Sequence, residues 1–271
     1  MIAYPNAKIN LGLNVIRKRP DGFHDIESVF FPIPWKDILE IVPEKKGRGQ
    51  ATFSSSGIPI PHQGEPNLCE KVYALMHREL NLPSVKMHLH KVVPIGAGMG
   101  GGSADAAFAA STLNKLFSLN LSDEKLEQIV AQVGSDCPFF IRNKAAFVTG
   151  RGDILESFEI NLSGFWIMIV NPNIHIGTKE AYSGVRPSPS SVDLRAILTE
   201  HPSKWKDRLR NDFEDSVFPT HPVLPQLKSK FYTRGALYAA MTGSGSTVFG
   251  LFENEPEPIE KEKYQLKIAR L

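Results

Sequence analysis

Cysteine and long hydrophobic runs are both scarce in this chain of 271 residues. Its two cysteines, Cys69 and Cys137, are too few for a disulfide framework and lack the spacing of a metal site, so we expect buried, reduced thiols. The apolar segment 165–170 is too short to cross a bilayer and predicts a buried strand. Polar residues within the first ten positions interrupt any signal-peptide core. These absences predict a soluble cytoplasmic protein without a membrane partner.

An excess of charge of either sign is also missing. Lysine and arginine number 31 against 29 aspartates and glutamates, which leaves a net charge of +2. Because no long basic run is present, nucleic acid is not expected as a partner. The length allows one large domain or two modest ones. The pattern of apolar residues changes near Gly150, and we predict two α/β halves, residues 1–150 and 151–271.

Glycine, by contrast, is concentrated in one short segment. The sequence from Pro94 to Asp105 reads PIGAGMGGGSAD and contains five glycines. Glycine lets the backbone approach a ligand closely and adopt positive φ without strain. An alternating segment, 85–93, precedes this loop and an alanine-rich helical pattern follows it, so the loop would direct a helix N-terminus at an anion. It predicts phosphate binding, the alternative being a tight turn without a ligand.

Two familiar phosphate motifs do not fit this loop. The P-loop needs a lysine before its final Ser or Thr, whereas Ser103 directly follows Gly102. The dinucleotide fingerprint is formally present at residues 96–101 but requires an acid at the end of a second strand about 20 residues later. The corresponding region, 119–132, has the pattern of a loop and a helix capped by Ser122. A dehydrogenase is therefore disfavoured.

Candidate catalytic groups occur in two other segments. Residues 7–16 alternate as a strand whose polar face carries Lys8, Asn10 and Asn14. Such a lysine is commonly just solvated, although three polar side chains together can line a cleft. Asp136 follows a predicted helix end within an apolar surround. It either caps that end or accepts a cationic partner, for which Lys8 is the candidate.

Aromatic and imidazole groups follow the turn at residues 20–22. Phe23 and His24 there could stack on a base and read its edge, or simply begin a strand. His88 and His90 lie two apart on a predicted strand without a third ligand nearby. An exposed strand face explains them better than a metal site, and no metal-ligating residues are predicted.

Taken together, these segments resemble the GHMP small-molecule kinases over nearly the whole chain. Two further patterns resemble the branch whose substrates carry a cytidine diphosphate group. The matching segments are residues 5–11 (first motif), 94–105 (ATP loop), 134–138 (catalytic segment) and 241–246 (third motif), with the branch patterns at 19–24 and 211–214.

The resemblance implies a two-domain α/β (α+β) fold. Residues 1–150 would form a nucleotide-binding domain similar to the second domain of ribosomal protein S5, and residues 151–271 a ferredoxin-like substrate domain. ATP would phosphorylate a hydroxyl of a small molecule carrying cytidine diphosphate, with Mg²⁺ required. The alternatives are a kinase for mevalonate, homoserine or a sugar, and a non-catalytic nucleotide-binding protein of the same fold.

The resemblance also implies roles for individual residues. Asp136 would be the general base, with Lys8 orienting it and keeping it ionised. ATP would be bound by Asn67 and by the loop residues Pro94, Ile95, Gly96, Ala97, Gly98, Met99, Gly100, Gly101, Gly102, Ser103 and Ala104. Substrate would be bound by Asn10 and Thr178, by His24 at the cytosine edge, and by Phe23 and Tyr182 on the two faces of the cytosine ring.

The chain departs from the family pattern at three places. Phe23 stands where tyrosine is usual and keeps the stacking face. Ala104 replaces a frequent second serine of the loop. The stretch after Phe252 is short, which predicts a reduced last helix.

Overall fold

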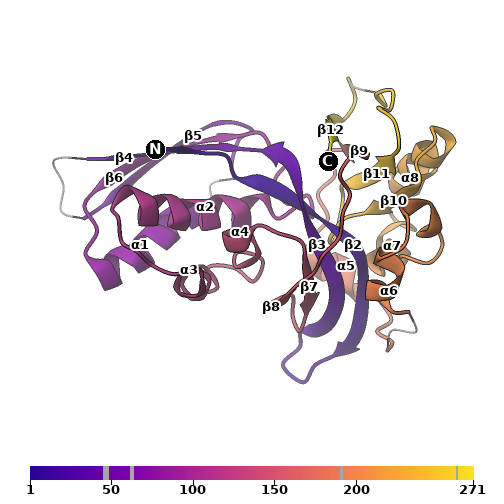
Figure 1. The fold of residues 1–271 in the computed structure, drawn as a ribbon, viewed down its shortest axis with the longest axis horizontal. Coiled ribbons are helices and arrows are strands. Elements are labelled where there is room, and N and C mark those ends of the chain that lie inside the picture. The colour runs from indigo at the N-terminus through magenta and orange to yellow at the C-terminus, as the bar shows by residue number, and fades with distance from the viewer. Residues whose placement is uncertain (45–48, 62–63, 190–191, 261) are drawn as a thin grey trace. The chain divides into compact units, whose positions relative to one another are not determined.

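The computed structural model describes residues 1–44, 49–61, 64–189, 192–260 and 262–271 (Figure 1). They form two compact units, each assembled from separate segments of the chain. Unit 1 comprises Met1–Ala7, Trp35–Ile95 and Gly100–Lys144, and unit 2 comprises Lys8–Pro34, Gly96–Met99 and Ala145–Leu271. The glycine-rich loop therefore contributes its ends to unit 1 and its middle to unit 2.

Unit 1 is a four-stranded sheet with helices packed on it. The strand order is β1 (Ile2–Ala3), β4 (Ile38–Pro43), β6 (Val85–Lys91), β5 (Ala51–Gly57), and the pairs are antiparallel except β5 with β6. The helices are α1 (Leu68–Leu80), α2 (Gly101–Leu116), α3 (Asp123–Val130) and α4 (Phe139–Arg142). Figure 1 shows α1 and α2 lying side by side. Their buried residues join those of β4 and β6 in one core.

Local sequence explains why the helices of unit 1 begin where they do. Asn67 caps α1 in a complete capping box: its side chain accepts from the N–H of Cys69, and Glu70 accepts from the N–H of Asn67. Ser122 caps α3 by accepting from the N–H of Lys125. The helix that begins after Ser122 is the one that the sequence predicts.

Unit 2 contains two further four-stranded sheets. One has the order β2 (Asn6–Lys18), β3 (His24–Lys36), β7 (Ala146–Thr149), β8 (Ile154–Ser157). The other has the order β10 (Tyr238–Met241), β11 (Val248–Phe252), β9 (Trp166–Asn171), β12 (Gln265–Arg270), and all its pairs are antiparallel. The helical segments of unit 2 are α5 (Thr178–Ser183), α6 (Leu194–Leu198), the 3₁₀ turn Pro202–Lys204, α7 (Phe213–Val217) and α8 (Val223–Thr233).

The compact units do not follow a single boundary at Gly150. Strands β2 and β3 share a sheet with β7 and β8, so residues 8–34 group with the C-terminal half of the chain. Pairing between distant segments of the chain leaves no mark in local composition, which is why the sequence pointed to one boundary. The division of functions between residues 1–150 and 151–271 stays a prediction.

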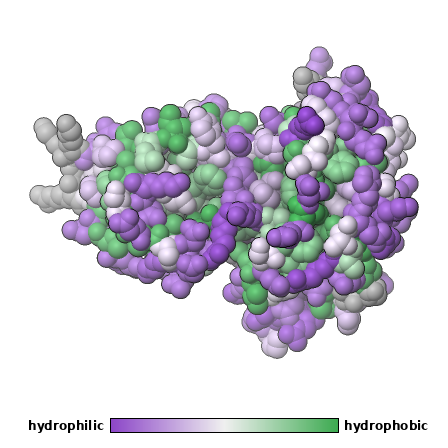
Figure 2. Space-filling model, in the orientation of Figure 1, coloured by the Kyte–Doolittle hydropathy of each residue, from purple (hydrophilic) through white to green (hydrophobic). Residues whose placement is uncertain are grey.

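Several local expectations can be compared with the described residues. Both cysteines are buried free thiols. In the described part of the chain no helix follows β11, and the chain returns as strand β12. None of the described helices combines the length and apolar character that a membrane crossing needs. On the face shown in Figure 2, hydrophilic residues are spread widely and hydrophobic ones form smaller groups.

Candidate active site

The C-terminal end of the glycine-rich loop forms the first turn of α2. The cap residue is Gly100, at φ 67°, which has no side chain to satisfy the helix N–H groups. The first helical hydrogen bond runs from the N–H of Ala104 to the carbonyl of Gly100, at 2.9 Å. The N–H groups of Gly101, Gly102 and Ser103 thus precede the helical ladder, and an anion is their natural partner.

The middle of the loop lies in unit 2 and needs glycine for two reasons. Gly96 and Gly98 have φ of 63° and 74°, in the left-handed region. A Cβ on Gly98 would lie 2.1 Å from the carbonyl oxygen of Thr242, which no side chain tolerates. The loop backbone therefore packs directly on the backbone of the 242–246 turn.

Asn10 connects the loop partner Thr242 to strand β2. The N–H of Asn10 donates to the Thr242 hydroxyl at 3.0 Å, and its Oδ1 accepts from the N–H of Gly243 at 3.0 Å. Its Nδ2 donates to the Ser28 hydroxyl at 2.9 Å. The Thr242 hydroxyl also lies 3.2 Å from the carbonyl of Gly98. The first motif, the middle of the loop and the third motif are thus in contact within unit 2.

Lys8 is buried rather than solvated. Its Nζ donates to Oδ1 of Asn10 at 2.8 Å and lies 4.0 Å from the centre of the Phe30 ring, while its N–H donates to the carbonyl of Met99 at 3.0 Å. Only 3% of the residue is exposed. Desolvating a charge is costly, so a buried ammonium group is normally held by hydrogen bonds or by an opposite charge.

Asp136 lies in the turn between α3 and α4 of unit 1. The next residue, Cys137, is fully buried, and its thiol is hydrogen-bonded to the Ser103 side chain. Burial raises the pKa of the Cys137 thiol to about 11. The Asp136 segment therefore packs against the first turn of α2, where the N–H groups of the loop end. Lys8 belongs to unit 2, so the predicted pairing of Lys8 with Asp136 stays a prediction.

Asn67 also belongs to unit 1, at the start of α1. A Cβ on Gly102 would lie 3.6 Å from Cδ1 of Leu68, so the start of α1 contacts the start of α2. The cap residue of α1 and the glycine-rich turn are therefore neighbours. This supports a nucleotide contact for Asn67 besides its capping role.

Two of the groups expected at a base, His24 and Tyr182, contact each other in the structure. The imidazole of His24 stacks on the ring of Tyr182, with centroids 4.6 Å apart and planes 18° apart. Phe23 is 56% exposed, and the guanidinium of Arg151 lies 5.0 Å from its ring centre. Burial is the main cause that lowers the pKa of His24, with Lys18 adding to it. A cytosine sandwich between Phe23 and Tyr182, with Thr178 at the start of α5, stays a prediction.

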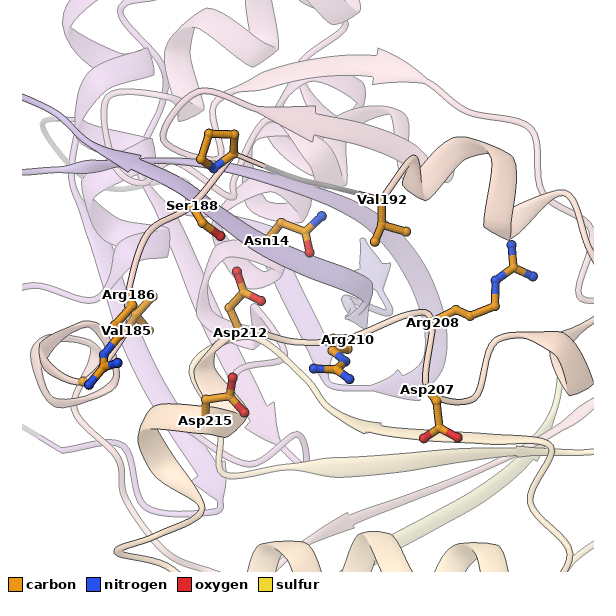
Figure 3. A pocket seen from close by; sticks show the side chains of 12 residues that line it. Asn14, Val185, Arg186, Ser188, Val192, Asp207, Arg208, Arg210, Asp212 and Asp215 are labelled. Atoms are coloured by element: carbon orange, nitrogen blue, oxygen red, sulfur yellow. The ribbon is translucent and has the colours of Figure 1, made fainter.

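A pocket of about 860 Å³ in unit 2 contains Asn14 but not Lys8 or Asn10 (Figure 3). Asp212 lies beside Asn14 at its wall, and its Oδ2 accepts from the N–H of Val15 at 2.7 Å. Burial raises the pKa of Asp212. Asn14 thus lines this pocket, whereas Lys8 and Asn10 on the same strand are buried.

Two groups of residues were missed by sequence reasoning. Asn211 donates through Nδ2 to the carbonyls of Met241 and Gly243, at 2.8 and 2.9 Å, and so holds the third motif. Lys91 lies in a buried ion cluster at the ends of the glycine-rich loop. Asn211 begins a pattern that had been noted without a role, whereas nothing in the local sequence marked Lys91.

Comparisons with known proteins show the family to which the chain belongs. The profile of the GHMP kinases N terminal domain matches residues 67–144, and that of the GHMP kinases C terminal domain matches residues 193–264. The chain belongs to the GHMP kinases, and the predicted two-domain α/β fold of that family is confirmed.

The more similar relatives narrow the family further. A 4-diphosphocytidyl-2-C-methyl-D-erythritol kinase of Cytophaga hutchinsonii is 52% identical over 95% of this chain and 94% of its own length. Another of Bacteroides fragilis is 46% identical over 98% of this chain and 96% of its own length. A crystal structure of 4-(cytidine 5'-diphospho)-2C-methyl-D-erythritol kinase covers 94% of this chain and 91% of its own, with 28% identity and a TM-score of 0.81.

Proposed function

We propose that this chain transfers a phosphoryl group from ATP to the C2 hydroxyl of 4-diphosphocytidyl-2-C-methyl-D-erythritol. This reaction belongs to the non-mevalonate pathway to isoprenoid precursors. The observation that carries the proposal is the relative 52% identical over 95% of the chain, which bears the name of that kinase. We also propose that the protein acts in the cytoplasm, which its scarcity of cysteine favours.

Positioning and charge neutralisation account for most of the catalysis of phosphoryl transfer. The N–H groups at the start of α2 bind phosphate oxygens, and the positive φ of Gly96 and Gly98 lets the loop backbone lie against them. Asp136 accepts the proton of the attacking hydroxyl, a step worth about 10²–10⁴-fold. Lys8 keeps that carboxylate ionised and oriented.

Mg²⁺ accompanies ATP in the proposed reaction and, when bound, neutralises phosphate charge. The described residues include no group of three or more His, Cys, Asp or Glu side chains that could hold a metal ion alone. Mg²⁺ bound to a nucleotide needs only one or two protein oxygens, because the phosphates and waters supply the others. A metal that arrives with ATP therefore needs no such group in the chain.

Recognition of a pyrimidine base is supported by the groups around His24. A neutral imidazole has one donor and one acceptor nitrogen, which suits the polar edge of cytosine. The stack on Tyr182 holds the ring plane, and exposed Phe23 offers an aromatic surface next to it. Asn10 and Thr178 complete the proposed substrate contacts.

Other kinases of the family are the rival function. A mevalonate kinase of Methanococcus jannaschii covers 99% of this chain with a TM-score of 0.69, but at 12% identity it shares the fold alone. We expect the purified chain to phosphorylate the cytidyl substrate at least a hundredfold more efficiently, in kcat/KM, than mevalonate or homoserine, about 3 kcal/mol of discrimination. Equal efficiency would contradict the proposal and favour a broader kinase.

A further inference from the structure

Three charged side chains are buried together in unit 1, outside the groups that the proposed reaction uses. Nζ of Lys91 lies 2.5 Å from Oδ2 of Asp37 and 2.7 Å from Oδ2 of Asp105. No more than 4% of any of these side chains is exposed. Lys91 ends β6, Asp37 directly precedes β4, and Asp105 lies in the second turn of α2.

The cluster holds both ends of the glycine-rich loop. Oδ1 of Asp37 accepts from the N–H groups of Val92 and Val93, at 2.6 and 2.8 Å, which are the last residues before the loop. Asp105 lies just beyond the loop, on the helix whose first turn presents the phosphate-binding N–H groups. Through Lys91 the two carboxylates connect the segment that enters the loop to the helix that leaves it.

The contact between Lys91 and α2 is close. A Cβ on Gly101 would lie 3.1 Å from Nζ of Lys91 and 3.1 Å from Cγ1 of Val93. The first residue of α2 therefore rests directly on the ammonium group. A shift of Lys91 would move the start of this helix, and with it the donors of the loop.

Stability alone does not explain such a cluster. Buried ion pairs often stabilise a protein no more than apolar side chains of the same volume, because desolvation offsets their attraction. Here one cation faces two carboxylates, and Oδ1 of Asp105 has no hydrogen-bond partner among the described residues. Burying these charges costs desolvation energy and leaves one oxygen without a hydrogen bond. The cluster therefore points to a role other than stabilising the fold.

We propose that Lys91, Asp37 and Asp105 form a positioning cluster that fixes the two ends of the glycine-rich loop in the geometry that binds the phosphates of ATP. The inference rests on the proposed nucleotide role of that loop. The three residues do not touch ATP. They act through the loop backbone, and Asp105 is the link that ties α2 to the rest of the cluster.

Asp105→Ala tests this link with little damage to the fold. It removes the tie to α2 but leaves Lys91 paired with Asp37, so no buried charge loses its only partner. The dissociation constant of MgATP, measured by titration calorimetry on the full chain, should rise about tenfold, since small displacements of binding groups are costly. Asp105→Asn keeps an oxygen that accepts from Lys91 and should bind MgATP within about twofold of the original chain.

A control separates positioning from general loss of stability. Ile129→Ala opens a cavity in the core of unit 1, on α3, and should lower the melting temperature at least as much as Asp105→Ala does. Its MgATP dissociation constant should stay unchanged. Lys91→Met is the harsher variant and should weaken MgATP binding at least as much as Asp105→Ala. If Lys91→Met does not fold, the comparison of Asp105→Ala with Asp105→Asn tests the inference without it.

Three results would overturn the inference: unchanged MgATP binding in Asp105→Ala, equal weakening in Asp105→Asn, or equal weakening in Ile129→Ala. Because the readout is nucleotide binding, it does not depend on the identity of the phosphoryl acceptor. A chain that binds MgATP but ignores the cytidyl substrate would refute the proposed function and leave the inference standing.

Discussion

The carbonyl oxygen of Thr242 occupies the place that a side chain on Gly98 would need, 2.1 Å from the position of its Cβ. Two segments 144 residues apart in the sequence thus meet backbone to backbone within unit 2. The contact is reinforced by the Thr242 hydroxyl, which lies 3.2 Å from the carbonyl of Gly98. The turn at residues 241–246, the third motif of the family, therefore supports the middle of the glycine-rich loop by direct backbone packing.

Gly98→Ala should displace the loop and destroy MgATP binding. The new methyl group meets backbone rather than a flexible side chain, and φ of 74° adds strain of about 1–3 kcal/mol. Gly164→Ala is the matched control, because Gly164 has φ of 97° but nothing lies within 4 Å of its Cβ position. We expect calorimetry to detect no MgATP binding by the first variant and normal binding by the second. Normal binding by Gly98→Ala would mean that the loop does not carry the phosphates.

Asp136→Asn should lower kcat by about 10²–10⁴-fold while MgATP still binds, because only the proton acceptor is lost. A coupled assay for ADP gives kcat, and calorimetry gives the dissociation constant. Glu79→Gln, which removes an exposed charge on α1, serves as the control and should retain full activity. Near-normal kcat in Asp136→Asn would remove this carboxylate from the mechanism.

Lys8→Met should reduce kcat by a similar factor, since the ammonium supports the ionised base. The apolar part of the side chain is preserved, so packing near Phe30 is little changed. Calorimetry should show that MgATP still binds to the variant, because the lysine acts on the proton acceptor and not on the nucleotide. A kcat close to that of the original chain would reduce Lys8 to a structural residue.

His24 should make substrate binding sensitive to acid. Burial lowers its pKa from the ordinary 6.5, so the ring is neutral at pH 7 and its neutral form is the one that stacks on Tyr182. The KM for the cytidyl substrate should be constant above pH 6.5 and should rise when the pH falls low enough to protonate the ring. His24→Gln should lose this pH dependence, whereas the KM for ATP should be unaffected in both proteins. A KM that is independent of pH down to the acid limit of stability would contradict this role.

Asp105 should make the free energy of unfolding depend on pH. Burial is the main cause that raises its pKa to about 7 in the folded chain, from an ordinary value of 3.8. The folded state then binds more protons than the unfolded state between these values, so the stability from protonated Asp105 is full below pH 3.8 and is lost as the pH rises through 7. Urea unfolding at pH 5 and pH 8 should show a decline for the original chain and a smaller one for Asp105→Asn. Equal declines would assign the slope to other groups.

Local features of the site were accessible from the sequence because they depend on neighbouring residues. The strand pattern around Lys8 and the glycine-rich segment can each be recognised from a few neighbouring residues. The order of these segments also sufficed to indicate the family, and the comparisons confirm it.

Relationships across long stretches of chain were not accessible in this way. Asp37 and Asp105 meet at Lys91 although their surroundings in the sequence have nothing in common. The stack of His24 on Tyr182 depends on how β3 and α5 pack, and single residues do not specify it. The grouping of β2 and β3 with the C-terminal half follows from strand pairing, which composition does not reveal.

The position of the transferred phosphate tests the central claim most directly. The purified chain is incubated with ATP, Mg²⁺ and 4-diphosphocytidyl-2-C-methyl-D-erythritol labelled with ¹³C, and the product is examined by ³¹P and ¹³C NMR. We expect one ADP per product and new phosphorus couplings centred on C2, over two bonds to C2 itself and over three bonds to the carbons attached to it. ATP consumption without that coupling, or an unreacted substrate beside a chain that phosphorylates mevalonate or homoserine, would contradict the account.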